Sequence, residues 1–513
     1  MPADPAVRPT AAEDPRPTVA VVGGGVSGLV AAWRLVTAPD APRVVVLEAG
    51  ARFGGVLRVG DVGPVEVDLG AESLLARRPE AVDLVHELGL GDRLVHPVTT
   101  TANVVRAGRL LPMPAGTLMG VPADPGTLHG LLTAAEVGRV AAERERPTEP
   151  VEADVDVASW VAGRVGRAVV DRLVEPLLGG VYAGHADRLS LQATVPALWR
   201  WARSGGSLLD GVAATLRESP GTPVFAGIEG GVGRLAEVLA DRLRDRGADL
   251  RTRTTVHGLD PLDPLDPLEP LDPLEPVERP ERPERPRGRW RLLLGPAPAG
   301  GVHHATHLDV DAVVLAVPAR AASRLLAGPC PAASTALGDV EAASVGLVVA
   351  VVDRQALAGL PGSGVLVPPV EGRAVKAMTF ASAKWGWVDR LDPDLAVVRL
   401  SLGRHGEEAV LQRDDADLAA LALADAADLL ARPLAPVAVR VVRWGGALPQ
   451  PAVGHVPRIA AVRAALAGVP GLALAGAALD GVGVPACIAA AGRAAGDVLA
   501  GLPGRSRTTA AAG

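Results

Sequence analysis

The chain has 513 residues, more than one hydrophobic core usually serves, so two or more domains are expected. Its formal net charge is −7, which excludes the overall basic surface that attracts nucleic acid. No run approaches the ~18 apolar residues that a membrane helix needs, although peripheral contact with a membrane stays open.

The first segment predicted to lack structure is 1–17, which is rich in Pro, Ala and charge and has no apolar centre. It is therefore a disordered tail and not a signal peptide. Cys330 and Cys487 lie far apart and give no disulfide framework, which favours a cytoplasmic location. Peripheral attachment at the inner face of the cell membrane is the alternative.

The stretch from Thr18 to Glu48 predicts a strand, a glycine turn, a helix and a second strand. Its G-x-G-x-x-G spacing is typical of a dinucleotide-binding unit, in which the helix N-terminus faces a pyrophosphate. The acid that ends the second strand, Glu48, is placed to accept hydrogen bonds from a ribose. The residues predicted to contact the dinucleotide are Gly23, Gly24, Gly25, Val26, Ser27, Gly28 and Glu48.

The residues directly after Glu48 form an E-A-x-x-R-x-G-G arrangement. This arrangement resembles the flavoprotein superfamily of monoamine oxidases, carotenoid desaturases and porphyrinogen oxidases. The resemblance implies that the dinucleotide is FAD rather than NAD. It also implies cofactor contacts by Ala49, Arg52, Gly54 and Gly55.

A strand from about Val65 breaks at a glycine, and in the superfamily the following loop returns to the flavin. The resemblance thus implies flavin contacts by Gly70, Ala71, Glu72 and Ser73. The commoner family pattern there is E-R-G-P-x-S-F, and the missing arginine and aromatic residue leave the flavin-edge contacts undefined.

Arg77 and Arg78 precede a helical pattern that starts near Pro79. Paired arginines at a helix start are ordinarily solvated surface charges. The alternative is that Arg78 faces a substrate cavity and meets a carboxylate.

A hairpin is predicted over 106–114, and the pattern is helical from about 128 to 203. Within it, Glu175 to Gly184 reads E-P-L-L-G-G-V-Y-A-G, which resembles a signature of protoporphyrinogen and coproporphyrinogen oxidases. The residues alone predict a helix end with Tyr182 in a core. The resemblance implies a cavity wall from Gly180 to Tyr182, and both can hold together.

The segment 250–258 predicts a strand, and the resemblance implies that the backbone of Val256 meets the adenine end of the cofactor. Residues 259–289 repeat D-P-L and E-R-P, so they predict an extended, Pro-rich insertion that catalysis does not need. His303, His304 and His307 have no cysteine or carboxylate set at ligand spacing, so no metal site is expected.

Residues 308–317 predict a buried strand, and 345–442 predict an antiparallel sheet. The segment R-W…P-Q…G-H that follows matches the family, which implies that Trp444 contacts flavin. Near the C-terminus a strand ends at Gly476, and G-V-G-V-P-A-C-I opens a helix whose N-terminus suits the negative charge of reduced flavin. The implied contacts are Gly476, Val482, Gly483 and Val484, with Cys487 in packing.

The predicted fold class is α/β, α+β overall, with a Rossmann-type FAD-binding domain assembled from discontinuous segments. The segments of this domain are 18–95, 224–331 and 465–502. Segments 96–223 and 332–464 form a substrate-binding domain with a mixed or antiparallel sheet and a helical subdomain at about 115–205. Residues 503–513 are a second tail.

The resemblance implies FAD-dependent oxidation of coproporphyrinogen III to coproporphyrin III in haem biosynthesis, with molecular oxygen as acceptor and hydrogen peroxide as by-product. Protoporphyrinogen IX is the alternative substrate. An amine or carotenoid oxidoreductase and a non-catalytic flavoprotein scaffold are the other hypotheses. A downstream haem-pathway enzyme is a candidate partner.

Overall fold

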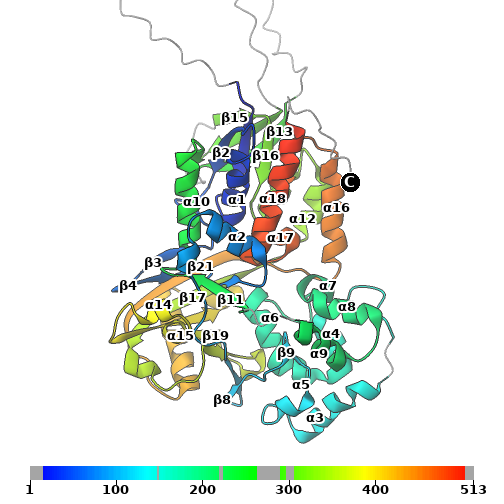
Figure 1. Ribbon diagram of the computed structural model, residues 1–513, viewed down its shortest axis with the longest axis vertical. Helices are drawn as coiled ribbons and strands as arrows, with labels where there is room; N and C mark the ends of the chain where they lie inside the picture. Colours follow the sequence, from blue (N-terminus) through cyan, green and yellow to red (C-terminus); the bar gives the residue numbers. More distant parts are fainter. Residues whose placement is uncertain (1–14, 147–148, 219–222, 263–288, 296–305, 503–513) are drawn as a thin grey trace, which may run out of the picture.

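The computed structural model describes residues 15–146, 149–218, 223–262, 289–295 and 306–502. Most of the predicted tails and of the 259–289 insertion, and His303 and His304, lie outside these residues. The described chain forms an upper lobe and two lower lobes, one built on a sheet and one helical (Figure 1). No helix among the described residues is both long enough and apolar enough to span a membrane.

The upper lobe is built on a five-stranded sheet in which every neighbouring pair of strands is parallel. The strand order is β12 (Asp249–Arg251), β2 (Arg43–Leu47), β1 (Thr18–Val22), β16 (Ala312–Leu315) and β22 (Leu472–Leu474). These strands come from segments far apart in the sequence. The predicted α/β fold, with a parallel sheet assembled from discontinuous segments, is therefore confirmed.

Alternating side chains of the sheet pack on two helical layers. Val19 and Val21 face α1 (Val26–Val36), α10 (Arg234–Asp245) and α18 (Val484–Gly501). Ala20 and Val22 face α11 (Ala319–Leu326), α12 (Pro331–Gly338) and α16 (His455–Ala467). Because both faces are covered, the strands are apolar throughout, as parallel strands require.

Two segments predicted as single strands, 250–258 and 308–317, are each divided into two strands. The first breaks at 252–254, where the backbone N–H of Thr254 donates to the carbonyl of Glu48 at 2.9 Å. The chain then leaves the parallel sheet and forms an antiparallel sheet of β13 (Thr255–Pro261), β14 (Trp290–Gly295) and β15 (Thr306–Val310). β13 thus extends beyond residue 259, where the insertion was expected to begin.

The sheet of the lower lobe has seven strands. Their order is β21 (Pro436–Pro449), β17 (Ala342–Asp353), β20 (Leu395–Leu402), β19 (Val375–Phe380), β18 (Gly364–Leu366), β7 (Asn103–Arg106) and β8 (Arg109–Pro112). All neighbours are antiparallel except β18 and β7. The predicted sheet and the predicted hairpin are therefore present and form one structure, which α15 (Asp415–Leu430) covers on one face.

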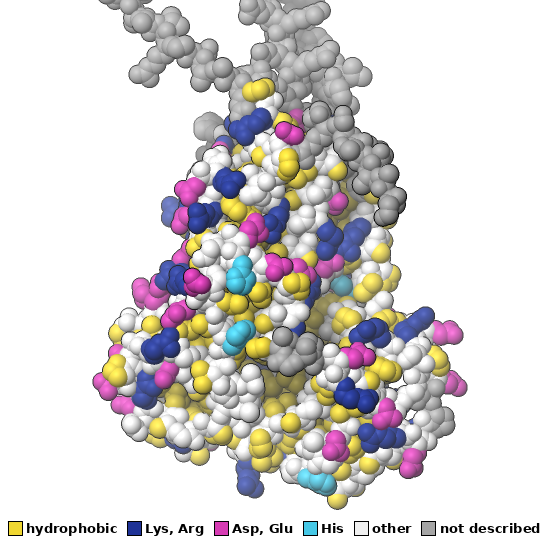
Figure 2. Space-filling view, in the orientation of Figure 1, with side chains coloured by type: hydrophobic (Ala, Val, Ile, Leu, Met, Phe, Trp, Pro, Cys, Tyr) yellow, Lys and Arg dark blue, Asp and Glu magenta, His cyan; other side chains and the backbone are white. Residues whose placement is uncertain are grey.

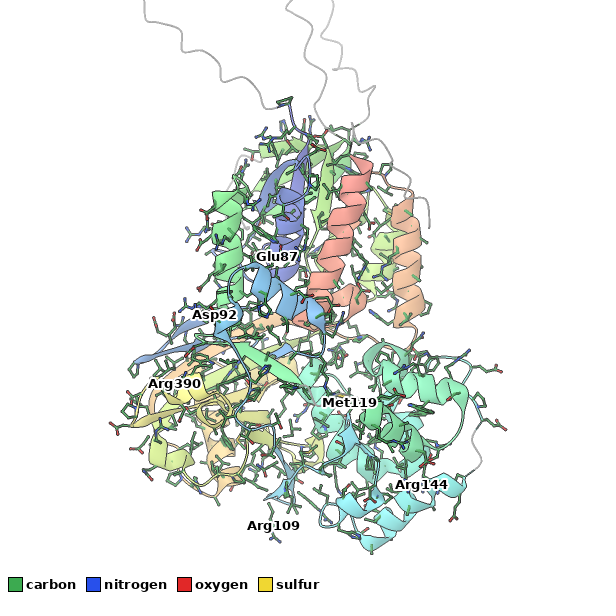
Figure 3. All side chains as sticks on the ribbon, viewed as in Figure 1. Glu87, Asp92, Arg109, Met119, Arg144 and Arg390 are labelled. Atoms are coloured by element: carbon green, nitrogen blue, oxygen red, sulfur yellow. The ribbon has the colours of Figure 1, made fainter. Side chains whose placement is uncertain are left out.

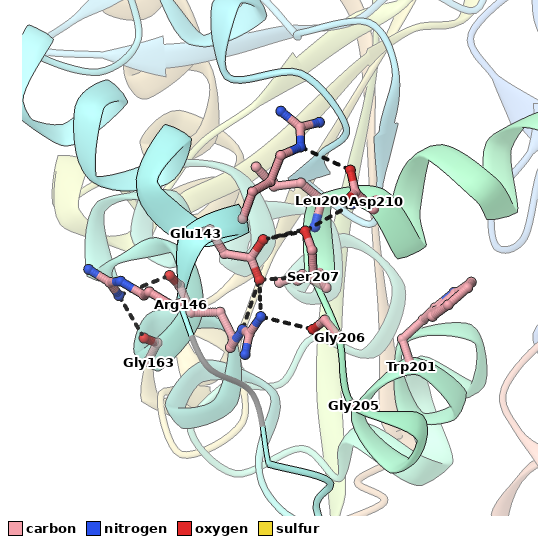
Figure 4. Close-up of polar contacts among 12 residues, drawn as sticks. Glu143, Arg146, Gly163, Trp201, Gly205, Gly206, Ser207, Leu209 and Asp210 are labelled. Atoms are coloured by element: carbon pink, nitrogen blue, oxygen red, sulfur yellow. Dashed lines mark hydrogen bonds and ion pairs between the residues drawn. The ribbon is translucent and has the colours of Figure 1, made fainter.

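The helical lobe packs around a carboxylate that is fully buried (Figure 4). Glu143 accepts hydrogen bonds from the Leu208 N–H and the Ser207 hydroxyl, both at 2.7 Å, and pairs with Arg164. Burial raises the pKa of Glu143, but these hydrogen bonds outweigh burial and leave the pKa lowered. Glu143 thereby joins the end of α3 (Ala134–Ala141) to α4 (Val157–Val165) and α9 (Leu208–Glu218).

Replacing Glu143 with Ala should lower the free energy of unfolding by about 3 kcal/mol, because Arg164 loses its buried partner. Urea denaturation at pH 7 measures this change. Because the folded pKa is lowered, the stabilisation is present above the ordinary carboxyl pKa and is lost as the pH falls through the folded value. The difference between wild type and variant should therefore shrink in acid. The exposed neighbour Glu145→Ala is the control, and equal losses in both variants would contradict the assignment.

Candidate active site

The glycine turn between β1 and α1 leaves open space in front of the helix. A Cβ on Gly28 would lie 1.8 Å from the carbonyl oxygen of Gly23, so only glycine lets the helix pack against the turn. A Cβ on Gly25 would meet no atom within 4 Å. The open side of Gly25 therefore offers room for a group that approaches the backbone closely, as the G-x-G-x-x-G spacing predicts.

Two helix N-termini lie at the carboxyl edge of the parallel sheet, and α1 and α18 pack against each other (Figure 1). Neither N-terminus has a side-chain cap, so its first N–H groups stay available. Both termini therefore favour negative charge, as the sequence predicts for a phosphate at α1 and for reduced flavin at α18. Cys487 of α18 lies beside Ser27 of α1, and burial raises the pKa of its thiol, which fits a packing role.

The loop after Glu48 folds over the glycine turn. Glu48 accepts hydrogen bonds from the N–H groups of Gly24, at 2.7 Å, and Gly50, at 2.6 Å. Gly54 donates its N–H to the carbonyl of Gly24 at 2.7 Å. An ionised carboxylate has about four acceptor positions, so Glu48 keeps acceptors for a ribose.

Trp444 joins this loop to the seven-stranded sheet. The guanidinium of Arg52 lies 5.6 Å from the centre of the Trp444 ring and donates to the carbonyl of Gly55 at 2.5 Å. The indole N–H of Trp444 donates to the carbonyl of Leu69 at 3.0 Å, and the ring packs beside Gly70. Four predicted flavin contacts, distant in sequence, therefore lie together.

The adenine end predicted at Val256 is also next to Glu48. The backbone of Thr254 binds the Glu48 carbonyl, and Thr255 and Val256 follow directly. The buried hydroxyl of Thr255 has no hydrogen-bond partner among the described residues. A buried hydroxyl without a partner is costly, so it is a candidate contact for a bound nucleotide.

An open surface lies across from the glycine turn, on α6 (Glu175–Tyr182). A Cβ on Gly180 would meet only Leu366 of β18, at 3.8 Å. Val181 next to it is 45% exposed, and the cross-strand pair Leu75 and Phe225 is 39% and 37% exposed. Figure 2 shows a hollow with hydrophobic walls between the lobes, and Met119 lies in this central region in Figure 3.

A cavity of ≈ 240 Å³ adjoins the loop before α18. It lies between α16 and α7 (Leu191–Thr194), and Val482 and His455 are among its lining residues. His455 is 5% exposed, and its Nδ1 has no partner among the described residues. Burial lowers the pKa of His455, so a neutral imidazole stands beside the predicted flavin loop.

The sequence profile of one protein family, described as flavin containing amine oxidoreductase, matches residues 26–266 and 299–499. The chain belongs to this family. The predicted FAD cofactor, flavoprotein family and oxidoreductase class are thereby confirmed.

The chain is also similar to named porphyrinogen oxidases and to one solved structure. Coproporphyrinogen III oxidase of Mycobacterium tuberculosis is 38% identical over 485 residues, which cover 94% of this chain and 97% of that protein. Protoporphyrinogen oxidase of Macaca fascicularis is 28% identical, and the match covers 95% of this chain and 99% of that protein. The crystal structure of a putative protoporphyrinogen oxidase from Exiguobacterium sp. 255-15 has a TM-score of 0.78 at 30% identity and covers 94% of this chain and 98% of its own.

The residues of this flavoprotein fit FAD. Gly25 leaves the space that a pyrophosphate needs, and the uncapped N-termini of α1 and α18 present free N–H groups. Gly476 and the segment Val482–Gly483–Val484 lie before and at the start of α18, next to the ring that the fold would hold there.

The side chain of Glu72, which was expected to contact flavin, is engaged by two cations of the chain. Its carboxylate is held by Lys384, at 2.7 Å, and by Arg399, which also donates to the carbonyl of Gly70. Burial raises the pKa of Glu72, but the charges of Arg399 and Lys384 outweigh burial and lower it to about 2. Glu72 therefore fastens the 70–73 loop to the seven-stranded sheet, and Ser73 follows it in that loop.

Lys384 and Arg399 were not among the residues named from the sequence. The only available signal was composition, because Lys376 and Lys384 are the only lysines among 51 basic residues. Lysine is the basic residue whose pKa shifts readily on burial, so rare lysines in an arginine-rich chain merit inspection.

The two other side chains proposed for the substrate cavity have partners within the chain. The hydroxyl of Tyr182 points into the helical core and donates to the Thr194 carbonyl at 3.5 Å, because the helix turns this side chain away from the hollow. Burial raises the pKa of Tyr182 to about 12, so it stays protonated. Arg78 is 42% exposed in its side chain and pairs with Glu80 at the start of α2 (Pro79–Glu87).

Replacing Gly25 with Val should abolish flavin retention without unfolding the protein. The residue has an ordinary φ of −72° and free space around it, so the polypeptide tolerates the side chain and the cofactor does not. We expect the affinity for FAD to fall at least ~100-fold, about 2.7 kcal/mol. Absorbance at the flavin band and circular dichroism give the two readouts.

Gly328→Val is the matched control, because a Cβ there also meets nothing within 4 Å and the residue lies between α11 and α12. A yellow Gly25→Val protein with normal flavin content would show that the cofactor does not approach this turn.

Replacing Glu72 with Gln should lower the free energy of unfolding at pH 7 by about 3 kcal/mol, since two buried cations lose their carboxylate. The folded pKa of Glu72, about 2, is below its ordinary value of 4.5, so the stabilisation is full above pH 4.5 and is lost towards pH 2. The gap between wild type and variant should close across this window in urea titrations. Glu237→Gln, which breaks an exposed ion pair with Arg234, should change stability by less than about 0.5 kcal/mol.

Proposed function

We propose that this flavoprotein oxidises a porphyrinogen, with coproporphyrinogen III as its substrate and protoporphyrinogen IX as the second candidate. The observation that carries the proposal is the Glu175–Gly184 segment, which resembles porphyrinogen oxidases in sequence. It forms the helix whose Gly180 leaves open space opposite Leu366. The named relatives, which include coproporphyrinogen III oxidases, support the same reaction.

The absence of a side chain on Gly180 and the exposed apolar side chains suit a bulky, largely apolar macrocycle. Val181, Leu75 and Phe225 would exclude water from the reacting carbons. Bound FAD supplies the hydride acceptor. The chain's task is to hold the macrocycle against it, so few side chains need to move protons.

The N-terminus of α18 would stabilise negative charge at the pyrimidine end of the cofactor through its free N–H groups. Arg78 would meet a propionate at the mouth of the hollow by exchanging Glu80 for the substrate. Molecular oxygen as final acceptor, peroxide formation, a cytoplasmic location and a downstream haem-pathway partner belong to this proposal.

The direct test is turnover of both porphyrinogens by the purified, FAD-loaded protein, followed by porphyrin fluorescence and peroxide release. We expect a higher kcat/KM for coproporphyrinogen III. Preference for protoporphyrinogen IX would overturn the substrate choice. A yellow protein that oxidises neither would leave a flavoprotein scaffold or an oxidoreductase of another substrate class.

Replacing Gly180 with Leu should cut kcat/KM for the porphyrinogen at least ~100-fold while flavin content stays normal, because the new side chain fills the space opposite Leu366. Gly163→Leu is the control, since Gly163 is an exposed helical glycine in α4 with nothing around its Cβ position. Undiminished porphyrin formation by Gly180→Leu would place the substrate elsewhere.

A further inference from the structure

Two buried cations lie together at the border between the seven-stranded sheet and the helical lobe. Lys376 of β19 is 3% exposed, and Arg404, just after β20, is 5% exposed. Arg404 donates to the carbonyl of Val367 at 3.0 Å, and the Glu407 carboxylate is 3.8 Å away. Within the described chain, the Lys376 ammonium makes no hydrogen bond or ion pair.

This arrangement costs free energy in the protein alone. A buried cation is expensive unless a carboxylate or several hydrogen bonds compensate it. Burial first, and the charge of Arg404 second, lower the pKa of Lys376 to about 7. The Glu175 carboxylate, which also faces Arg404, is already engaged by the Ala186 N–H at 2.7 Å and by His185 at 3.0 Å.

The position of the pair relates it to the substrate hollow. Lys376 directly precedes Ala377, whose partner on β18 is Leu366. Leu366 is the residue that faces the open side of Gly180, and α6 packs against both β18 and β19. The Val367 N–H donates to the Lys376 carbonyl at 2.9 Å, and Arg404 donates to the Val367 carbonyl, so both cations belong to the backbone segment directly next to the Leu366–Ala377 pair.

We propose that Lys376 and Arg404 form a carboxylate-binding subsite of the substrate hollow, next to Leu366. The subsite would take a propionate that coproporphyrinogen III carries and protoporphyrinogen IX replaces with a vinyl group. This inference rests on the proposed function and makes the two residues determinants of substrate specificity.

The chemistry explains the preference. Coproporphyrinogen III has four propionates and protoporphyrinogen IX has two. A vinyl group at the subsite would leave Lys376 without a partner. Discrimination therefore comes from this penalty on protoporphyrinogen IX as much as from the bond to coproporphyrinogen III. Arg404 offers a planar fork of donors, and Lys376 offers a compact charge.

The use of lysine also fits. The basic residues of this chain are almost all arginine, and Lys376 is one of two lysines. An arginine stays charged when buried, whereas a lysine can release its proton while the subsite is vacant and regain it with a carboxylate. Binding of a tetracarboxylate near pH 7.5 should therefore be accompanied by proton uptake.

The experiment compares wild type with Lys376→Met as FAD-loaded, full-length proteins. We expect kcat/KM for coproporphyrinogen III to fall ~30-fold and kcat/KM for protoporphyrinogen IX to change by less than ~2-fold. Titration with the oxidised products, coproporphyrin III and protoporphyrin IX, should show the same split in Kd. Calorimetry in buffers of different ionisation enthalpy should detect proton uptake by wild type only.

Arg109→Met is the control, because Arg109 is an exposed cation at the lower tip of the molecule (Figure 3). It should change neither kcat/KM for the two porphyrinogens nor Kd for the two porphyrins. Equal losses for both substrates, or no loss, would overturn the subsite. If wild type oxidises neither porphyrinogen, the proposed function fails, and product binding alone then decides the subsite.

Lys376→Arg guards against a folding defect in the first variant. It retains a charge that cannot be released, so it should keep the preference for coproporphyrin III and lose the proton uptake. Proton uptake that persists in Lys376→Arg would assign it to another group and overturn the role of Lys376.

Discussion

The structure depends on two uncapped helix N-termini at the carboxyl edge of one parallel sheet. α1 begins 25 residues into the chain, and α18 ends the described chain, yet they pack side by side. Their free N–H groups cannot pair within the helices, so they favour an anionic group in the space beside Gly25 and beside the start of α18. Buried apolar residues of the two helices pack in one core and hold the termini together.

The other lobes are attached to this nucleotide-binding unit by a few buried polar contacts. Trp444 reaches from the seven-stranded sheet to Arg52 and the Leu69 carbonyl, and Glu72 is held by two cations from the same sheet. These contacts hold the sheet in a defined position relative to the nucleotide-binding unit. α6 closes the far side with a glycine where a side chain would fill the hollow.

The buried cations of this molecule differ in whether a buried carboxylate compensates their charge. Glu72 compensates Lys384 and Arg399, so those cations stabilise the fold. Lys376 is equally buried but has no ion pair among the described residues, and Arg404 has an exposed carboxylate, Glu407, at 3.8 Å. The compensating charge that we propose for Lys376 is a carboxylate of the substrate.

The sequence alone was enough to predict those elements that depend on interactions between residues close together in the chain. The strand, glycine turn and helix from Thr18, the apolar parallel strands and the opening of α18 follow from periodicity and glycine spacing, which depend on neighbours in sequence. Tertiary structure alone decided which residue faces which. The engagement of Glu72 by cations more than 300 residues away, the turning of Tyr182 into the helical core and the division of 250–258 between two sheets all depend on long-range packing. The partners that set the charge of Lys376 likewise come from other elements, and side-chain burial and Coulomb energy exist only after those elements have packed.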